Sequence, residues 1–453
     1  MFALTMSDSV RRKNAAPNTF HESVSGHTRS LCLTRHRNVF GSAFQIQWGD
    51  RILTTSTRKR ANANSTSGVR FNMFRRRLAR VMLGTAAVVA VLLPIASSRA
   101  ASAGGTASPI HGVMDDVSCQ PGQCVGIGFQ ENSKLLYTGI QSWTLSQGVW
   151  SVATQPNTAS KGLTSVSCPQ LGMCVGVGYT IYQTSNYRGF AERLDAGVWQ
   201  VTPVPASGST FLRSVSCVSP TWCVAVGSTT QPPTSAVLLQ WNGTTWSHLT
   251  TPLVMPPSVL DAVSCLSLSD CMAVGFSKST LLAEEWNGSK WTVVTPYPQN
   301  LGQTYYAPSA LSCTSSTSCL AVGAVYTTTG RFQGVAWTWD GTSWAYAPTP
   351  PFVQDVLTGV SCTSPTACLV VGSHSPSDAP KFPPSALVEQ WNGAAMSPVA
   401  GAALGQQSAL SAVSCSQASW CVAVGSITIR VGGVRPLIER WNGTTLNRMG
   451  ALG

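Results

Sequence analysis

Fourteen cysteines are the residues whose type and spacing most clearly predict chemistry in this chain. They form seven pairs, one spaced C-x4-C and six spaced C-x5-C: Cys119 and Cys124, Cys168 and Cys174, Cys217 and Cys223, Cys265 and Cys271, Cys313 and Cys319, Cys362 and Cys368, and Cys415 and Cys421. Outside the reducing cytosol, an even and regularly spaced set indicates disulfides. A structural zinc site needs four ligands, whereas each pair offers two thiols and no histidine recurs beside them. We therefore predict seven local disulfides, no metal and no cofactor.

Catalytic acids are harder to identify. Glycoside hydrolysis requires two unique carboxylates that converge in one cleft. Four glutamates share one position two residues before a Trp or its equivalent, so we interpret them as a repeated charge on a strand face: Glu192, Glu284, Glu389 and Glu439. His374 and Asp378 are the only unique histidine and acid close together, and no third group is evident to orient them. These patterns favour a non-catalytic protein, with an enzyme as the alternative.

The paired cysteines belong to a repeat. Their first members are spaced by 49, 49, 48, 48, 49 and 53 residues. Each copy contains an apolar run ending in VSC or LSC, a second run of the type CVAVGS, a third run ending before Asn-Gly or an equivalent, and a fourth run. Four strands in a period near 50, repeated seven times, are typical of a seven-bladed β-propeller. We predict an all-β fold of four-stranded antiparallel blades, with an open solenoid as the alternative.

The third and fourth runs carry recurring turn and aromatic residues. Asn-Gly is a strong hairpin signal because both residues of a tight turn need positive φ. A tryptophan precedes the turn in five copies, and a second one follows it in several. We expect these rings to pack between neighbouring blades. The five are Trp241, Trp286, Trp339, Trp391 and Trp441.

The order of strands followed by Asn/Asp-Gly-x-x-Trp resembles the Asp-box propellers, a sialidase-like group. The segment Trp339-Asp340-Gly341-Thr342-Ser343-Trp344 is nearest to the motif, although its acid is adjacent to the glycine and most copies have Asn. The chain resembles kelch repeats more weakly, and the cysteine-bracketed form is similar to uncharacterised exported actinobacterial proteins. The resemblance implies a propeller and an exported protein. A sialidase-type site would further imply an arginine cluster and a tyrosine nucleophile.

Comparison of the seven copies predicts where a ligand would bind. In such a blade the first and third turns emerge on one face, and the second turn and the link to the next blade emerge on the other. The cysteine turn and the Asn-Gly turn are nearly constant, whereas the second turns and links differ widely. Function on a rigid scaffold usually resides in such loops. The candidate ligand-binding residues there are Tyr182, Tyr187, Arg188, Tyr305, Tyr306, Tyr326, Arg331, Phe332, His374, Asp378 and Lys381.

The N-terminal part of the chain has a different composition. Residues 1–103 contain 16 Lys and Arg and 3 Asp and Glu, and residues 104–453 contain 13 and 14, so the repeat is almost neutral and nucleic acid is not an expected partner. Residues 73–103 have the basic, apolar and A-x-A parts of a signal peptide. A membrane anchor is the alternative, but an apolar run interrupted by Pro94 is short for a spanning helix. Export by the Sec or the twin-arginine route remains open.

We interpret residues 1–72 as a disordered or wrongly annotated extension, with a functional basic arm as the alternative. Residues 104–453 are expected to form the propeller. The predicted protein is a monomer in the secreted or cell-envelope fraction that meets the membrane only during export. It would bind a protein or glycan through its variable loops, and the alternative is a sialidase-like glycosidase or lyase.

Overall fold

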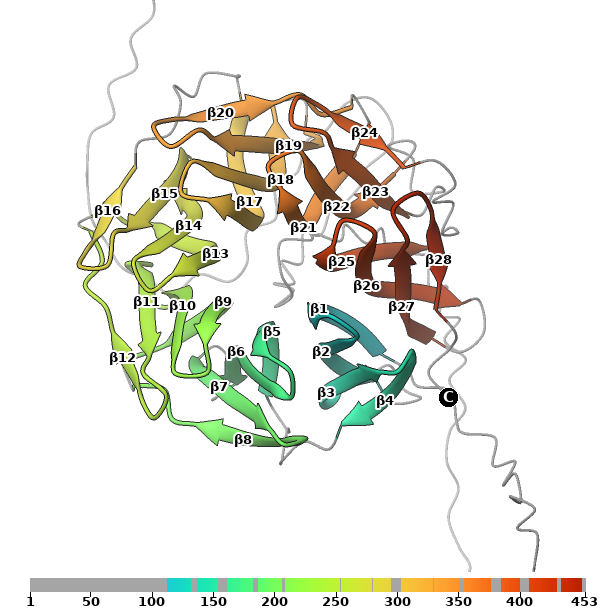
Figure 1. The fold of residues 1–453 in the computed structure, drawn as a ribbon. Coiled ribbons are helices and arrows are strands. Elements are labelled where there is room, and N and C mark those ends of the chain that lie inside the picture. The colour runs from blue at the N-terminus through green and yellow to red at the C-terminus, as the bar shows by residue number, and fades with distance from the viewer. Residues whose placement is uncertain are drawn as a thin grey trace, which may run out of the picture. The chain divides into compact units, whose positions relative to one another are not determined.

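The computed structural model describes residues 112–131, 137–153, 161–181, 186–205, 208–252, 254–278, 280–294, 303–328, 330–350, 354–375, 384–399, 407–429 and 433–449. These residues form 28 strands in seven antiparallel sheets that stand around a ring (Figure 1). Each sheet contains four strands in chain order. The predicted seven-bladed, all-β fold is confirmed. Within the described residues, no helix is long and apolar enough to span a bilayer.

The first three blades are built from the following strands. They are β1 (Gly112–Gln120), β2 (Gln123–Glu131), β3 (Tyr137–Ser146) and β4 (Val149–Ala153) in blade 1, β5 (Lys161–Gln170), β6 (Met173–Ile181), β7 (Tyr187–Asp195) and β8 (Val198–Thr202) in blade 2, and β9 (Thr210–Ser219), β10 (Trp222–Thr229), β11 (Ala236–Trp241) and β12 (Trp246–His248) in blade 3.

The other four blades follow the same order. They contain β13 (Ser258–Ser267), β14 (Asp270–Ser277), β15 (Thr280–Trp286) and β16 (Trp291–Val293) in blade 4, β17 (Gln303–Ser315), β18 (Ser318–Thr327), β19 (Phe332–Trp339) and β20 (Trp344–Ala347) in blade 5, β21 (Asp355–Ser364), β22 (Ala367–His374), β23 (Ser385–Trp391) and β24 (Met396–Pro398) in blade 6, and β25 (Ser408–Gln417), β26 (Trp420–Ile429), β27 (Gly433–Trp441) and β28 (Leu446–Arg448) in blade 7.

Burial explains why the second strand of each blade is almost entirely apolar. In β10, the residues from Cys223 to Gly227 are all buried. Side chains alternate between the two faces of a strand, so a strand covered by a blade on each side needs apolar residues at every position. The cores confirm this arrangement, because Ala225 packs with blade 2 and Val224 and Val226 pack with blade 4.

The ring is closed by packing between blade 7 and blade 1. Met114 and Val117 of β1 share a core with Val422 and Val424 of β26. Blade 1 uses only residues of β1–β4, and blade 7 only residues of β25–β28. The two blades are therefore joined by side-chain packing and by a hydrogen bond from a backbone N–H to a serine, and neither blade contains a strand from the other end of the chain. The ring is closed, so the alternative of an open solenoid is wrong.

A serine in each inner strand joins neighbouring blades. It is the residue before the first cysteine, and its Oγ accepts a hydrogen bond from the backbone N–H of the first cysteine in the next blade. The distances lie between 2.9 and 3.1 Å, and the donor and acceptor pairs are Cys168 and Ser118, Cys217 and Ser167, Cys265 and Ser216, Cys313 and Ser264, Cys362 and Ser312, Cys415 and Ser361, and Cys119 and Ser414. The last pair connects blade 7 to blade 1, so the bonds form a complete circle.

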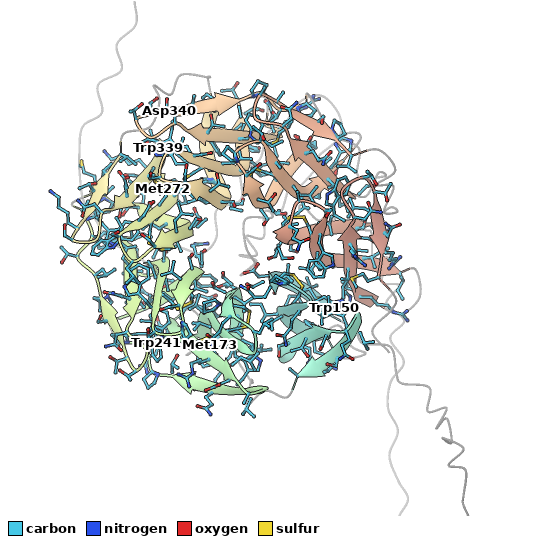
Figure 2. The ribbon with its side chains drawn as sticks, viewed as in Figure 1. Trp150, Met173, Trp241, Met272, Trp339 and Asp340 are labelled. Carbon is cyan, nitrogen blue, oxygen red and sulfur yellow. A yellow bond between two sulfur atoms is a disulfide. The ribbon has the colours of Figure 1, made fainter. Side chains whose placement is uncertain are left out.

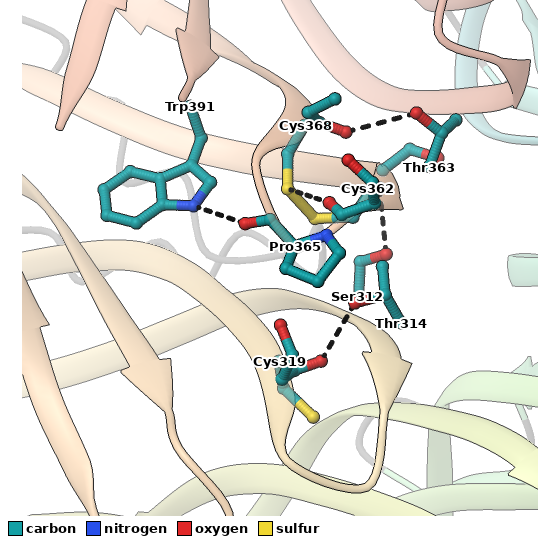
Figure 3. Close-up of a disulfide and its surroundings, with 12 residues drawn as sticks. Ser312, Thr314, Cys319, Cys362, Thr363, Pro365, Cys368 and Trp391 are labelled. Atoms are coloured by element: carbon teal, nitrogen blue, oxygen red, sulfur yellow. Dashed lines mark hydrogen bonds between the residues drawn. A yellow bond between two sulfur atoms is a disulfide. The ribbon is translucent and has the colours of Figure 1, made fainter. Parts of the chain in front are cut away.

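All seven predicted disulfides are present, one in each blade. Each disulfide connects the first and second strands of its blade, and the two Cα atoms are 3.9–4.1 Å apart. In blades 3 to 7, the turn between the two cysteines also receives a hydrogen bond from the tryptophan before the third turn. Figure 3 shows this in blade 6, where Trp391 Nε1 donates to the carbonyl of Pro365 at 3.1 Å.

The predicted geometry of the Asn-Gly turns is wrong. Gly243 has a φ of 94°, but Asn242 is absent from the described residues with positive φ, and the loop contains four residues between Trp241 and Trp246. The Oδ1 atom of Asn242 accepts bonds from the N–H groups of Thr244 and Thr245 at 2.9 and 2.8 Å. The side chain thus organises the loop, which removes the need for positive φ at the Asn itself.

Tight turns with two residues of positive φ occur instead in blades 1 and 2. They are formed by Gln147-Gly148 (φ 50° and 81°) and Ala196-Gly197 (φ 48° and 83°). Neither turn begins with Asn, so the sequence signal pointed to the wrong blades.

The recurring tryptophans pack between blades, as predicted. Trp241 is buried against Met173 and Val175 of blade 2, and Figure 2 shows Trp241 and Met173 close together. Trp339 of blade 5 packs in the same way against Met272 of blade 4. Each ring fills the outer part of a blade interface.

The interpretation of the four repeated glutamates as strand-face charges is wrong. Glu192, Glu284, Glu389 and Glu439 are 0–1% exposed, and within the described residues their carboxyl oxygens have no hydrogen-bond partner. Neighbouring positions show why, since Leu282 and Trp286, which share the strand face of Glu284, pack against blade 3. Burial raises the pKa of each carboxyl group to about 7.

Candidate functional site

The two faces of the ring differ as predicted from the strand order. The cysteine turns and the third turns of the blades lie on one face, which we call the cysteine-turn face. The second turns and the links between blades lie on the other, which we call the variable face. Several predicted residues that we assigned to loops lie in strands near the variable face: Tyr187 and Arg188 in β7, Tyr305 and Tyr306 in β17, Tyr326 in β18, Phe332 in β19 and His374 in β22.

The strands extend further toward this face than expected. Arg331 directly precedes β19. Tyr182, Asp378 and Lys381 lie outside the described residues. The predicted ligand-binding residues are also spread over blades 2, 5 and 6, so the fold does not gather them into one cluster.

The best-defined site on the variable face is an aromatic cluster of Tyr179, Tyr187 and Phe211. The rings of Tyr179 and Phe211 are stacked, with centroids 4.6 Å apart and an interplanar angle of 19°. Tyr187 meets both edge-on, at centroid distances of 5.6 and 5.8 Å. Because Phe211 comes from β9 and the two tyrosines from β6 and β7, the cluster connects blades 2 and 3.

Local structure holds the aromatic cluster in place. Gly162 of β5 leaves room for the Tyr179 ring, since a Cβ there would lie 2.7 Å from the ring. Ser209 fixes the backbone of Tyr187, because its Oγ accepts from the Tyr187 N–H at 3.1 Å and donates to the Tyr187 carbonyl at 3.0 Å. Thr230 of the second turn in blade 3 donates to the same Oγ at 2.7 Å. The cluster is therefore a rigid platform rather than a set of separate loop residues.

One cation lies against the aromatic cluster. The guanidinium carbon of Arg213 lies 5.1 Å from the centre of the Phe211 ring. Lys161 Nζ lies 4.6 Å from the centre of the Phe190 ring, which packs in the core between blades 1 and 2, on the other side of the blade 2 sheet. Aromatic rings with arginine at their edge are enriched at binding surfaces. This composition is suited to contact with a peptide or a saccharide.

The sequence analysis missed Tyr179, Phe211 and Arg213. A signal for Phe211 exists, because the residue six positions before the first cysteine is aromatic in blade 3 and is Val, Gly or Ala in the other copies. A single aromatic exception in an otherwise uniform inner strand is a weak signal for a site. Tyr179 stands at the expected start of a loop, whereas β6 continues to Ile181.

Each inner strand has a β-bulge at the same position, four residues before the first cysteine. Bulges redirect side chains and often lie near functional sites. The residues at the bulges are Asp115, Thr164, Arg213, Asp261, Ser309, Thr358 and Ser411. Arg213 and Asp261 form an ion pair between blades 3 and 4, with Nε and Oδ1 3.4 Å apart.

Blade 1 has two adjacent acids at this level, Asp115 at the bulge and Asp116 next to it, and no other copy has such a pair. Burial, followed by the charge of Asp116, raises the pKa of Asp115 to about 8. Asp116 also titrates higher than usual because of burial, with a pKa of about 6, although its carboxylate accepts from the N–H groups of Val117 and Val166 at 2.8 Å. Since Val166 belongs to blade 2, Asp116 serves to join blades and does not present a free catalytic carboxylate.

Tyr179 also lacks the properties of a nucleophile. Its pKa is raised to about 12, first by burial and then by the charge of Asp115. A catalytic nucleophile needs an adjacent base or a lowered pKa. The tyrosine hydroxyl therefore stays protonated and is suited to hydrogen bonding.

His374 lies at the end of β22, beside an acid of the neighbouring strand, whereas Asp378, the acid predicted to accompany it, lies outside the described residues. His374 pairs with Asp355 on β21 and with Ser385 on β23, so Asp, His and Ser occupy one row across three strands. Asp355 is 2% exposed, and its Oδ1 accepts from the N–H of Gly334 in blade 5 at 2.8 Å. Burial raises the pKa of Asp355, while that N–H and the charge of His374 oppose the rise. In the described part of the chain, no three His, Cys, Asp or Glu side chains converge as a metal site.

Comparisons with known proteins show the fold and no family. No family model and no curated protein matches the sequence. Among solved structures, the chain is similar to YCF48 from Cyanidioschyzon merolae, with a TM-score of 0.50 and 10% identity over 75% of this chain and 98% of that one. It is also similar to the GH74 xyloglucanase from Xanthomonas campestris, with a TM-score of 0.52 and 11% identity over 76% of this chain and 55% of that one.

A third similar structure is the BP39L lectin from Burkholderia pseudomallei, with a TM-score of 0.47 and 12% identity over 75% of this chain and 98% of that one. At such low identities the similarity concerns the β-propeller alone.

Proposed function

We propose that this protein is an exported, non-catalytic β-propeller that binds a protein or polysaccharide of the cell envelope through its variable face. The observation that carries the proposal is the aromatic cluster, in which Tyr179 and Phe211 stack across two blades and Tyr187 meets both rings edge-on. Rigid aromatic residues bind with little loss of side-chain entropy, and they contribute much of the free energy of many interfaces.

Export is supported by the disulfides. Seven of them suggest an oxidising, extracellular compartment. We further propose that residues 73–103 are a cleaved signal peptide and that the mature chain starts near Gly104, so residues 1–72 are not part of it. The intact mass of the secreted protein tests this point, and a product that retains residues 1–72 would contradict it.

The binding proposal is tested with the insoluble envelope fraction of the producing cells. Tyr187→Ala and Phe211→Ala should each weaken binding of the full chain about 30-fold, which corresponds to a hot-spot loss of about 2 kcal/mol. Leu171→Ala is the matched control, because Leu171 is an exposed apolar residue of the same blade on the cysteine-turn face. Unchanged binding by both aromatic variants, or an equal loss in the control, would count against the proposal.

The alternative function, a glycosidase or lyase, rests on the row of Asp355, His374 and Ser385. The carboxylate of Asp355 already accepts a hydrogen bond from the Gly334 N–H, which favours a structural role for these three residues. We expect no release of reducing sugar from envelope polysaccharide, and we expect His374→Ala to bind as the unchanged protein does. Turnover that disappears in His374→Ala would establish the enzymatic alternative.

A further inference from the structure

A cavity of about 390 Å³ lies between blades 5 and 6 on the cysteine-turn face. Its walls come from the cysteine turns of both blades, the end of β19, β20 and the third turn of blade 6. Figure 3 shows part of the wall, with Ser312 and Thr314 of blade 5 opposite Pro365 and Trp391 of blade 6. The aromatic cluster lies in other blades and on the other face, so this cavity is independent of the proposed function.

Two substitutions in the repeat explain why the cavity is large at this interface. In blade 3 the second tryptophan, Trp246, reaches the preceding blade, where its Nε1 donates to Thr202 Oγ1 at 3.1 Å. The residue of blade 5 equivalent to Thr202 is Ala347, three positions after the second tryptophan, and it lines the cavity. In blade 6 the second tryptophan itself is replaced by Met396. An indole at position 396 would therefore extend toward Ala347 and occupy part of the cavity.

The neighbouring interfaces have a larger residue on at least one side. The positions equivalent to Ala347 are Leu249 in blade 3, Val294 in blade 4 and Val399 in blade 6. Each of these side chains packs against the next blade. Between blades 6 and 7, where Val399 faces Leu446, the cavity is only about 30 Å³. The space between blades 5 and 6 thus follows from the small side chain of Ala347, together with the lack of an indole at position 396.

The lining is polar and carries one carboxylate. Hydroxyl groups come from Thr314, Thr317, Thr338 and Thr366, and apolar surface comes from tryptophan and proline side chains. No Lys, Arg, His or Glu is among the lining residues. The single acid there is Asp340, whose Oδ1 accepts from the N–H groups of Thr342 and Ser343 at 2.8 and 2.7 Å. An anionic ligand would find no counter-ion in this cavity, and the one carboxylate is held by hydrogen bonds within its own turn.

The size and polarity of the cavity limit the class of ligand further. Its volume lies at the small end of the range of ligand pockets, roughly 300–1,000 Å³. At ~30 Å³ per molecule it corresponds to about a dozen waters. A ligand that displaces these waters must replace their hydrogen bonds, and hydroxyl groups do so better than apolar groups. A compact, neutral molecule with many hydroxyl groups and some apolar C–H surface matches these requirements.

We propose that the cavity between blades 5 and 6 is a binding site for a neutral mono- or disaccharide. The sugar hydroxyls would exchange bonds with the threonine hydroxyls of the lining, and its C–H groups would lie against the rings and prolines. A second site on the face opposite the aromatic cluster would let one molecule contact two different components at once.

The test uses the full chain with its disulfides formed, and a panel of glucose, galactose, mannose, N-acetylglucosamine, maltose and cellobiose. Saturation-transfer NMR identifies a binder, and calorimetry measures its Kd. Ala347→Leu and Met396→Trp fill the cavity with residues that other blades already hold at these positions, so the ring should be retained. Val399→Leu and Leu446→Trp are matched controls, because they make the same changes at the interface of blades 6 and 7.

We expect at least one panel sugar to bind, with affinity reduced more than tenfold in both filling variants and unchanged in both controls. A thermal melt of every variant verifies that the ring is intact. The proposal would be overturned if the unchanged protein bound no sugar of the panel, or if Ala347→Leu and Met396→Trp both bound the sugar with unchanged affinity. Binding of an uncharged proline-rich peptide that Met396→Trp abolishes, without any sugar binding, would assign the cavity to a peptide and refute the saccharide.

Discussion

The serine before each first cysteine determines how neighbouring blades are joined. Ser264 Oγ accepts the backbone N–H of Cys313 in the next blade at 3.1 Å. Without this acceptor, a partly buried N–H loses its partner, and such a loss costs about 1–3 kcal/mol. The repetition of VSC is thus explained by the serine as well as by the cysteine. The sequence shows that this serine recurs, but its partner is in another blade, so spacing within one copy cannot reveal the bond.

We expect Ser264→Ala to lower the free energy of unfolding by about 1–3 kcal/mol. Denaturant unfolding followed by tryptophan fluorescence measures the change. Ser267→Ala is the control, because the Ser267 hydroxyl is exposed and bonds within its own turn. Equal stability of Ser264→Ala and the unchanged protein would contradict the role assigned to the circle of serines.

The buried glutamates make stability depend on pH. Burial raises the pKa of Glu284 from 4.5 to about 7. Between these values the unfolded chain releases a proton that the folded chain retains, so stability falls as pH rises from about 4.5 to 7. Below this window both states are protonated, and above it both are ionised. The contribution of these glutamates to the free energy of unfolding should consequently be larger at pH 5 than at pH 7.5.

Glu284→Gln should remove one such group and raise stability at pH 7.5 by on the order of 2 kcal/mol, since a pKa difference of one unit equals about 1.4 kcal/mol. Unfolding curves at pH 5 and pH 7.5 measure the effect. Glu285→Gln is the control, because the adjacent side chain is partly exposed. A Glu284→Gln variant that keeps the full pH dependence of the unchanged protein would show that Glu284 does not titrate in this range.

At the level of the elements, the disulfide supports the turn between the first two strands of each blade. Cys217 and Cys223 face each other on β9 and β10. Closing so small a loop contributes about 2 kcal/mol in the chain-entropy description. Trp241 also donates to this turn, through Nε1 to the carbonyl of Pro220 at 3.2 Å. The turn therefore has two supports, one covalent and one from the third strand.

The double variant Cys217→Ala/Cys223→Ala should lose about 2 kcal/mol of stability but keep the propeller. Differential scanning calorimetry measures the loss of stability, and far-UV circular dichroism shows whether the strands are retained. Complete unfolding of the variant at 25 °C would mean that one blade's disulfide is indispensable, and an unchanged melting temperature would mean that the disulfide adds nothing.

The elements were predictable where the signal is local. Periodicity and cysteine spacing predicted four strands and one disulfide per blade, because each depends on residues of a single copy. The turn after Trp241 was predicted incorrectly, since the carboxamide of Asn242 supplies bonds that a count of turn residues does not include. The burial of Glu284 was missed for a related reason: alternation places a side chain on one face of a strand, but only the neighbouring blade decides whether that face is covered.

At the level of the whole molecule, the closed ring has two faces that differ in their loops. The sequence predicted which face carries the candidate site, but not which residues form it. Tyr187 was identified from the variability of its segment, but its partner Phe211 comes from another blade, and the edge-on contact of the two rings depends on the angle between blades. The cavity between blades 5 and 6 was missed, because the cysteine-turn face looks uniform in sequence. The space arises from the small side chain of Ala347 and from Met396, which replaces a tryptophan 49 positions later.

Binding of the envelope ligand by the variable face can be measured by hydroxyl-radical footprinting of the full chain, free and bound to the insoluble envelope fraction. We expect binding to protect Tyr187 and Phe211 from oxidation. Leu171 and Leu268, which are exposed on the cysteine-turn face, should stay as reactive as before. Protection of Leu171 and Leu268 with no change at Tyr187 and Phe211 would contradict binding by the variable face.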